Sequence, residues 1–230
     1  MGAVRVMGVD SCRAGWVGIA PDDKAVRGYA AAEIGRLMEQ ADQDGQVDVV
    51  AIDIPIGLPD RGRRTADLLA KKLVGPRRSS VFITPVREAL MAPDHATAVR
   101  INRARAGEGV SVQAYALRRK LLAVDAWVRR TDRRVIEAHP EVSFAQLAGV
   151  PLRTPKKTWA GAEQRRQLLA SAGMRLAGHL GLEGVDAGLD DVLDAAAAAW
   201  TAHRFAAGQS IALPDPPETF SDGLPAAIWV

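Results

Sequence analysis

The chain contains 230 residues, of which 48% are hydrophobic and 25% are charged, and its formal net charge is +3. This balance excludes a wholly disordered chain, which would need few apolar residues or a large net charge. No apolar run approaches the roughly 20 residues that a membrane-spanning helix requires, and the start of the chain lacks the apolar stretch of a signal peptide. The single cysteine, Cys12, excludes an intrachain disulfide and fits a reducing compartment, so we expect a cytoplasmic protein.

Short apolar runs and turn residues alternate at the start of the chain. Three closely spaced runs, at 4–9, 15–20 and 25–31, predict an antiparallel meander of strands. A helix is expected over 32–43. The nearly all-apolar run 47–54 then predicts a buried central strand of a mixed or parallel sheet.

The rest of the chain is mainly helical in pattern. Helices are expected from residue 63 onward and over 96–106, 111–130, 142–148, 160–180 and 188–207. A short extended segment is expected at 81–84 and a brief strand at 135–138, and four prolines in the tail predict an extended strap over about 209–230. We therefore expect an α/β fold in one domain over residues 1–230, with a helical, basic insertion over about 61–134.

The charge is distributed unevenly along the chain. Between Arg61 and Arg134 there are 18 Lys and Arg residues against 6 Asp and Glu, whereas the remaining residues hold 12 basic and 21 acidic side chains. A basic block in an otherwise acidic chain indicates a face for a polyanion, and nucleic acid is the obvious partner. A solvated helical surface in an arginine-rich protein explains the same charge equally well.

Acidic residues occur where apolar strands end, although an unpaired buried charge is costly. Asp10 closes the first strand, Asp53 lies near the end of the fourth, and Glu137 lies in the strand after the basic block. Asp191 and Asp194 are three residues apart at the start of the last helix and share a helical face. Carboxylates so placed can supply the oxygen ligands that Mg²⁺ or Mn²⁺ prefers, and two such ions about 4 Å apart can promote phosphodiester cleavage.

Each of these acids also has an explanation that requires no metal. Asp10 can end a strand in a turn, where aspartate is common. Asp190 and Asp191 can cap the last helix, and Glu137 can pair with a neighbouring arginine. Asp53, within the sequence VAIDIPIGL, cannot be explained as a cap, and it weakens these alternatives when the acids are considered together.

Seven segments from residue 8 to the C-terminus form an ordered series: GVDSCRAGWVGIA, AIDIPIGLP, RRSSVFITPVR, HPEVSFAQL, TPKKTWAGAEQRR, DDVLDAAAAAWTA and LPDPPETFSDGLPAAIWV. In order and spacing they resemble the DUF429 family of predicted nucleases. The pair AIDIPIGLP and RRSSVFITP is specific, and the DD-x-x-DA helix is a third landmark. Many relatives have glycine where the first segment has Ser11 and Ala14; both residues are small, so we expect the turn to be retained.

The resemblance implies a ribonuclease H-like fold, with a mixed five-stranded sheet flanked by helices. It also implies a divalent-metal-dependent nuclease that hydrolyses DNA or RNA by a two-metal mechanism with Mg²⁺ or Mn²⁺. It places Asp10 at the acid that bridges both metals and Asp53 at the acid of the fourth strand. It places Asp191 and Asp194 at the metal-binding acids of the last helix, and Glu137 at an acid of the fifth strand that would join the catalytic set.

Basic and hydroxyl side chains in these segments are candidate substrate contacts. They are Arg13, Arg77, Arg78, Ser79, Ser80, Lys156 and Lys157. Guanidinium forks and hydroxyls can hold phosphate oxygens, but Lys156 and Lys157 are equally well explained as solvated loop lysines. His139 could transfer a proton, although a packed histidine is the commoner case. Four tryptophans are too dispersed to predict a base-stacking platform and are expected to anchor the core or the strap; they are Trp16, Trp159, Trp200 and Trp229.

Two other functions remain open. A non-catalytic nucleic-acid-binding or scaffold protein would keep the fold without the chemistry. An ATP-handling enzyme of the sugar-kinase and actin type shares the core fold, but it needs a second domain and a glycine-rich phosphate turn, for which this chain has no room. A cluster of acids should be stabilised by Mg²⁺ or Mn²⁺, whereas a scaffold would not respond.

Overall fold

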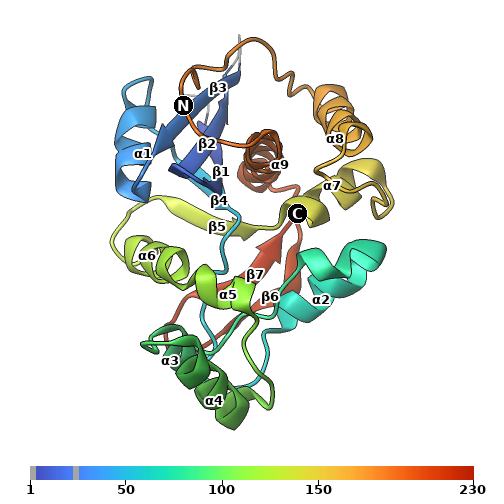
Figure 1. The fold of residues 1–230 in the computed structure, drawn as a ribbon. Coiled ribbons are helices and arrows are strands. Elements are labelled where there is room, and N and C mark those ends of the chain that lie inside the picture. Colours follow the sequence, from blue (N-terminus) through green and yellow to red (C-terminus); the bar gives the residue numbers. More distant parts are fainter. Residues whose placement is uncertain (1–3, 23–25) are drawn as a thin grey trace.

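A computed structural model describes residues 4–22 and 26–230, and Figure 1 shows its fold. The strands are β1 (Val6–Cys12), β2 (Gly15–Pro21), β3 (Val26–Ala31), β4 (Val49–Ile52), β5 (Arg134–Ala138), β6 (Ala212–Thr219) and β7 (Pro225–Trp229). The helices are α1 (Ile34–Asp42), α2 (Thr65–Val74), the 3₁₀ helix η1 (Gly75–Ser80), α3 (Arg87–Leu90), α4 (His95–Ala106), α5 (Val112–Ala116), α6 (Arg118–Val128), α7 (Pro140–Ala148), α8 (Trp159–Ser171) and α9 (Leu189–Ala206). The first residue of the predicted strand 25–31 lies outside the described residues.

The described strands form one mixed sheet in the order β3-β2-β1-β4-β5-β7-β6. Strand β2 is antiparallel to both β1 and β3, whereas β1, β4, β5 and β7 run parallel to one another. The antiparallel meander at the start of the chain and the buried parallel strand β4 are therefore confirmed.

The expected number of five strands was too low, because the C-terminal tail joins the sheet. The segment expected as an extended strap forms β6 and β7, which pair antiparallel and extend the sheet beyond β5. Strand β6 tolerates its prolines because it is an edge strand, where one side of the backbone has no ladder to complete. Its pairing with β7 is also irregular between Leu213 and Glu218.

Helices cover both faces of the sheet (Figure 1). On one face, Met7 and Val9 of β1 pack with buried side chains of α1 and α6. On the other face, the buried alanines 195–199 of α9 pack against β1, β2 and β4. Because side chains alternate along a strand, Gly8 and Asp10 point to the α9 face.

Gly8 allows α9 to lie very close to β1. A Cβ atom at this position would be 1.9 Å from the backbone nitrogen of Ala199 and 2.1 Å from the carbonyl oxygen of Ala195. No other residue type fits there without moving the helix. The glycine and the alanine run together bring Asp194, the residue before the run, close to Asp10.

The region between β4 and β5 is helical, as predicted for 61–134, and contains α2, η1 and α3 to α6. The predicted extended segment 81–84 is not a strand. Instead of joining a ladder, the backbone N–H of Thr84 donates to the carboxylate of Asp67 at 2.7 Å.

Two predicted helices are shorter in the structure. The helix expected over 111–130 is interrupted at Leu117, which separates α5 from α6. The helix expected over 160–180 ends at Ser171, and Gly173 follows with a φ of 87°. That left-handed conformation commonly ends a helix and is easiest for glycine.

Candidate carboxylate site

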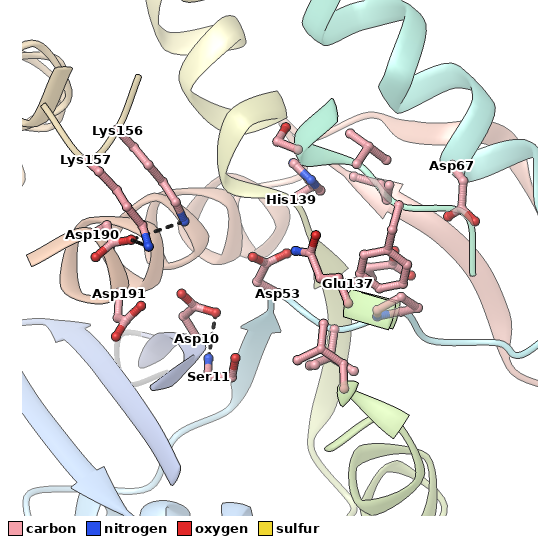
Figure 2. Close-up of a pocket in the computed structure, with 18 residues that line it drawn as sticks. Asp10, Ser11, Asp53, Asp67, Glu137, His139, Lys156, Lys157, Asp190 and Asp191 are labelled. Carbon is pink, nitrogen blue, oxygen red and sulfur yellow. Dashed lines mark hydrogen bonds and ion pairs between the residues drawn. The ribbon is translucent and has the colours of Figure 1, made fainter. Parts of the chain in front are cut away.

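Three carboxylates meet where β1 and β4 end. One carboxylate oxygen each from Asp10, Asp53 and Asp194 lies within 4.8 Å of the other two. Asp10 is 6% exposed and Asp194 is 2% exposed, while Asp53 is half-buried. Figure 2 shows Asp10 and Asp53 at this edge of the sheet, with Lys156 and Lys157 extending toward them.

The parallel pairing of β1 and β4 positions the first two acids. Val9 of β1 lies opposite Ile52 of β4. Asp10 and Asp53 are the residues that follow Val9 and Ile52. The backbone N–H of Asp53 donates to the carbonyl of Val9 at 2.9 Å, which continues the ladder to the acid itself. Asp194 approaches from α9 because of the close packing at Gly8.

Lys156 brings a positive charge into this group. Its ammonium group forms an ion pair with Asp194 and lies 3.8 Å from Asp190. The ammonium group of Lys157 is 3.9 Å from Asp190, but the side chain of Lys157 is 81% exposed while that of Lys156 is 31% exposed. One partly buried ammonium group therefore faces three carboxylates, which carry an excess of negative charge when all are ionised.

Burial is the largest cause of the raised pKa values of these three acids. Burial raises the pKa of Asp53 to about 7, although the charge of Lys156 opposes the shift. Burial likewise raises the pKa of Asp194 to about 6, and burial together with the charges of Asp53 and Asp194 raises that of Asp10. For Lys156, burial acts to lower the pKa, but the carboxylates outweigh it and the pKa is raised.

The donor set fits a divalent metal ion. Carboxylate oxygens are the ligands that Mg²⁺ and Mn²⁺ prefer. In addition, Oδ1 of Asp194 is buried and has no hydrogen-bond partner in the described part of the chain. Leaving such an oxygen unsatisfied costs on the order of 1–3 kcal/mol, so a cation at this position would satisfy an atom that the protein leaves unpaired.

Glu137 belongs to a different polar network. Its carboxylate pairs with the buried guanidinium group of Arg64 and accepts a hydrogen bond of 2.8 Å from the N–H of Ile56. Arg64 also lies 3.5 Å from Asp67. Burial raises the pKa of Glu137 to about 7, and Arg64 opposes the shift. Glu137 lines the same cavity as Asp10, but the structure does not bring it into the group of three acids.

Asp191 caps the helix that carries Asp194. Its carboxylate accepts a hydrogen bond of 3.0 Å from the N–H of Gly188, in a capping arrangement at the start of α9. The expectation that Asp191 caps the last helix is therefore confirmed. Asp191 lines the cavity with Asp190 but is not among the three acids that converge.

Asp10 and Asp53 line a cavity of about 370 Å³, whereas Asp194 is not part of its described lining. His139 lines it with a buried Nδ1 atom that has no partner among the described residues, and burial lowers the pKa of this histidine. Of the candidate substrate contacts, the lining includes Ser80, Lys156 and Lys157. The candidates that do not contribute to the described lining are Arg13, Arg77, Arg78 and Ser79. The guanidinium group of Arg13 instead lies 3.7 Å from Asp186 on the exposed surface.

Part of the charge of the basic block is neutralised within the protein. Among the described residues, six of its arginines form ion pairs with acids at 4 Å or less; they are Arg63 with Glu108, Arg64 with Glu137 and Asp67, Arg87 with Asp125, Arg105 with Glu88, Arg129 with Asp125, and Arg133 with Asp42. The use of this block as a nucleic-acid face stays a prediction.

One expectation about the tryptophans was wrong. Trp159, expected to be an anchor, is 81% exposed. The hydroxyl of Thr158 accepts a hydrogen bond of 3.1 Å from the N–H of Gly161 and so caps α8, which places Trp159 in the first turn. The sequence contained a signal for this helix start, because threonine is a common N-cap residue.

The fold and the site define a class of protein, a mixed α/β protein with three carboxylates suited to a metal ion at the carboxyl ends of two parallel strands. A family profile described as "Protein of unknown function (DUF429)" matches residues 8–219, and the chain belongs to this family. A search of curated proteins and a search of solved structures each found no match. No helix in the described ranges is both long enough and apolar enough to cross a membrane.

Proposed function

We propose that this protein is a divalent-metal-dependent hydrolase that cleaves phosphodiester bonds in DNA or RNA. The observation that carries the proposal is the convergence of Asp10, Asp53 and Asp194 from two strand ends and one helix. Acids on separate elements come this close at a cost in repulsion, and such a cost is commonly retained at functional sites.

The arrangement of strands supports a ribonuclease H-like core within this proposal. Strands β1 to β3 form an antiparallel meander, and β4 and β5 follow on the other side of β1 in parallel. At one edge of this sheet lie the three converging acids, Asp10 from β1, Asp53 from the residue after β4 and Asp194 from α9. Strands β7 and β6 would be an extension of that core.

Asp10, Asp53 and Asp194 would hold Mg²⁺ or Mn²⁺. Bound there, such ions supply Lewis-acid stabilisation of phosphate charge and lower the pKa of a bound water molecule. Asp191 keeps the start of α9 in place by capping it. Glu137 accepts a hydrogen bond from the N–H of Ile56 in the loop after β4. It would thereby help to keep Asp53, at the start of this loop, in position.

Lys156 has two successive roles in this proposal. In the metal-free protein it is the counter-ion of Asp194. With a cation held by the three acids, Asp194 would no longer need this counter-ion, and the ammonium group would be free to contact a phosphate oxygen of the substrate. Lys157 and Ser80, which line the same cavity, would add further contacts to phosphate.

The same ion pair favours a second candidate, a non-catalytic nucleic-acid-binding protein. In that case Lys156 would be a permanent structural partner of Asp194, and no metal would be required. The two candidates differ in whether Mg²⁺ or Mn²⁺ binds at the acids.

The test is a cleavage screen on single-stranded, duplex, branched and hybrid nucleic acids in Mg²⁺ and in Mn²⁺. It compares the wild type with Asp10→Asn and Asp53→Asn, and with Glu39→Gln as a control acid on the surface of α1. We expect metal-dependent cleavage that both aspartate variants lose while their circular dichroism stays unchanged. Cleavage of no substrate, or cleavage that both variants retain, would contradict the proposal.

A further inference from the structure

An exposed aromatic side chain lies beside the carboxylate cavity. Trp159 is 81% exposed and Leu189 is 59% exposed. Both line a hollow of about 400 Å³, whose other lining residues are Lys156, Lys157, Thr158, Ala162 and Asp190. Two large apolar side chains in one hollow, with two ammonium groups beside them, are unusual for a surface that faces only water.

The hollow and the carboxylate cavity are neighbours. Lys156, Lys157 and Asp190 line both of them. A ligand whose phosphate lies at the lysines can therefore place an attached group on the indole of Trp159.

The position of Trp159 is fixed by the start of its helix. The N–H of Thr158 donates to the carbonyl of Pro155 at 3.1 Å, and the Thr158 hydroxyl caps the N–H of Gly161. Gly161 packs so tightly on this turn that a Cβ atom would lie 1.9 Å from the carbonyl oxygen of Pro155. The indole is thus presented from a rigid turn, which reduces the entropy lost when a ligand binds.

We propose that Trp159 is a stacking platform for an unpaired nucleobase of the substrate. The inference rests on the proposed function and adds to it a substrate class, single-stranded nucleic acid or the unpaired end of a duplex. A nucleotide combines a flat π-face with an adjacent negative charge, which complements an exposed indole beside Lys156 and Lys157. A base inside a duplex is already stacked on both faces and cannot use the platform.

The experiment uses the fluorescence of the full-length Asp53→Asn variant in Mg²⁺, so that binding is measured without turnover. The chain has five tryptophans. Trp159 is exposed to solvent, and the other four are buried or half-buried. We expect a single-stranded oligothymidylate to protect this tryptophan from acrylamide quenching, whereas a blunt duplex and inorganic phosphate protect it much less. Trp159→Phe, which lacks the signal, identifies its source.

Binding of the same oligonucleotide is then compared among variants by anisotropy. Trp159→Ala should weaken binding by about tenfold, and Trp159→Phe should retain most of the affinity because it keeps an aromatic face. Met91→Ala, at another exposed apolar side chain that is 68% exposed, is the matched control and should bind as the parent does.

Equal affinity of Trp159→Ala and the parent, or quenching that the oligonucleotide does not change, would overturn the inference. So would protection that appears only as protein concentration rises, because a second copy of the chain would then cover the hollow. Absence of cleavage by the wild type contradicts the proposed function alone, since binding through Trp159 is measured separately. Cleavage by the wild type together with binding that ignores Trp159 contradicts this inference alone.

Discussion

Lys156 forms an ion pair with Asp194 inside a group of acids that otherwise lacks positive charge. The ammonium group is therefore the cation of the metal-free site. Under the proposed function, a metal ion at Asp194 would therefore compete electrostatically with Lys156 for the same carboxylate.

Replacing Lys156 by methionine should strengthen metal binding. The substitution removes the competing charge while keeping a long apolar side chain, so the affinity for Mn²⁺ should rise about tenfold, equivalent to about 1.4 kcal/mol. Lys157→Met is the matched control, because that ammonium group lies beside Asp190 and its side chain is 81% exposed. Titration calorimetry measures both, and unchanged or weaker Mn²⁺ binding by Lys156→Met would contradict competition.

Asp53→Asn should stabilise the metal-free protein above neutral pH. In the folded state the pKa of Asp53 is raised to about 7, whereas in an unfolded chain the pKa of an aspartate is about 3.9. The contribution of Asp53 to stability is thus present at low pH and is lost as the pH rises through about 7. The melting temperature of Asp53→Asn should match that of the wild type at about pH 4 and exceed it by a margin that grows until the pH reaches about 7. A difference that stays constant between about pH 4 and about pH 7 would show that burial does not hold the proton on Asp53 in the folded state.

Asp191 and Asp194 should differ sharply, although both lie at the start of α9. Asp191→Asn keeps an oxygen that can accept the N–H of Gly188, so the cap and the affinity for Mn²⁺ should both be largely retained. Asp194→Asn removes a member of the converging group, and Mn²⁺ binding should be lost. The reverse order in calorimetry would place the metal at Asp191.

Arg64→Met should destabilise the fold. Arg64 is fully buried against Glu137 and Asp67, and removing one partner of a buried ion pair costs about 3–5 kcal/mol. Arg63→Met, at the preceding residue, breaks only an exposed pair with Glu108 and should have little effect. Urea unfolding compares the two, and equal stabilities would show that the Arg64 network is not structural.

The sequence analysis named all three acids that converge, Asp10, Asp53 and Asp194, but it also named Asp191. Asp10 ends the apolar run 4–9 and lies near the end of β1, Asp53 directly follows β4, and parallel strands bring such positions to one edge of a sheet. The sequence could not separate Asp191 from Asp194. Residues three apart share a helical face, and only the position of the cap at Gly188 shows which carboxylate turns back to the backbone.

Other features depended on packing between distant segments. Gly8 and the alanines 195–199 are each unremarkable in sequence, and their significance is seen only when α9 lies against β1. The pairing of Glu137 with Arg64 joins residues 73 positions apart. The role of the tail was missed because prolines usually exclude a strand, although an edge strand such as β6 accepts them.

The central claim is that Asp10, Asp53 and Asp194 form a divalent-metal site, and metal-linked stability tests it most directly. We predict that Mn²⁺ raises the melting temperature of the wild type in a concentration-dependent manner, with about 2.7 kcal/mol of stabilisation at 100 times the dissociation constant. Asp10→Asn and Asp53→Asn should abolish this response, while the surface variant Glu39→Gln retains it. A wild-type melting temperature that does not change with Mn²⁺ or Mg²⁺, or an equal response in all four proteins, would contradict the claim.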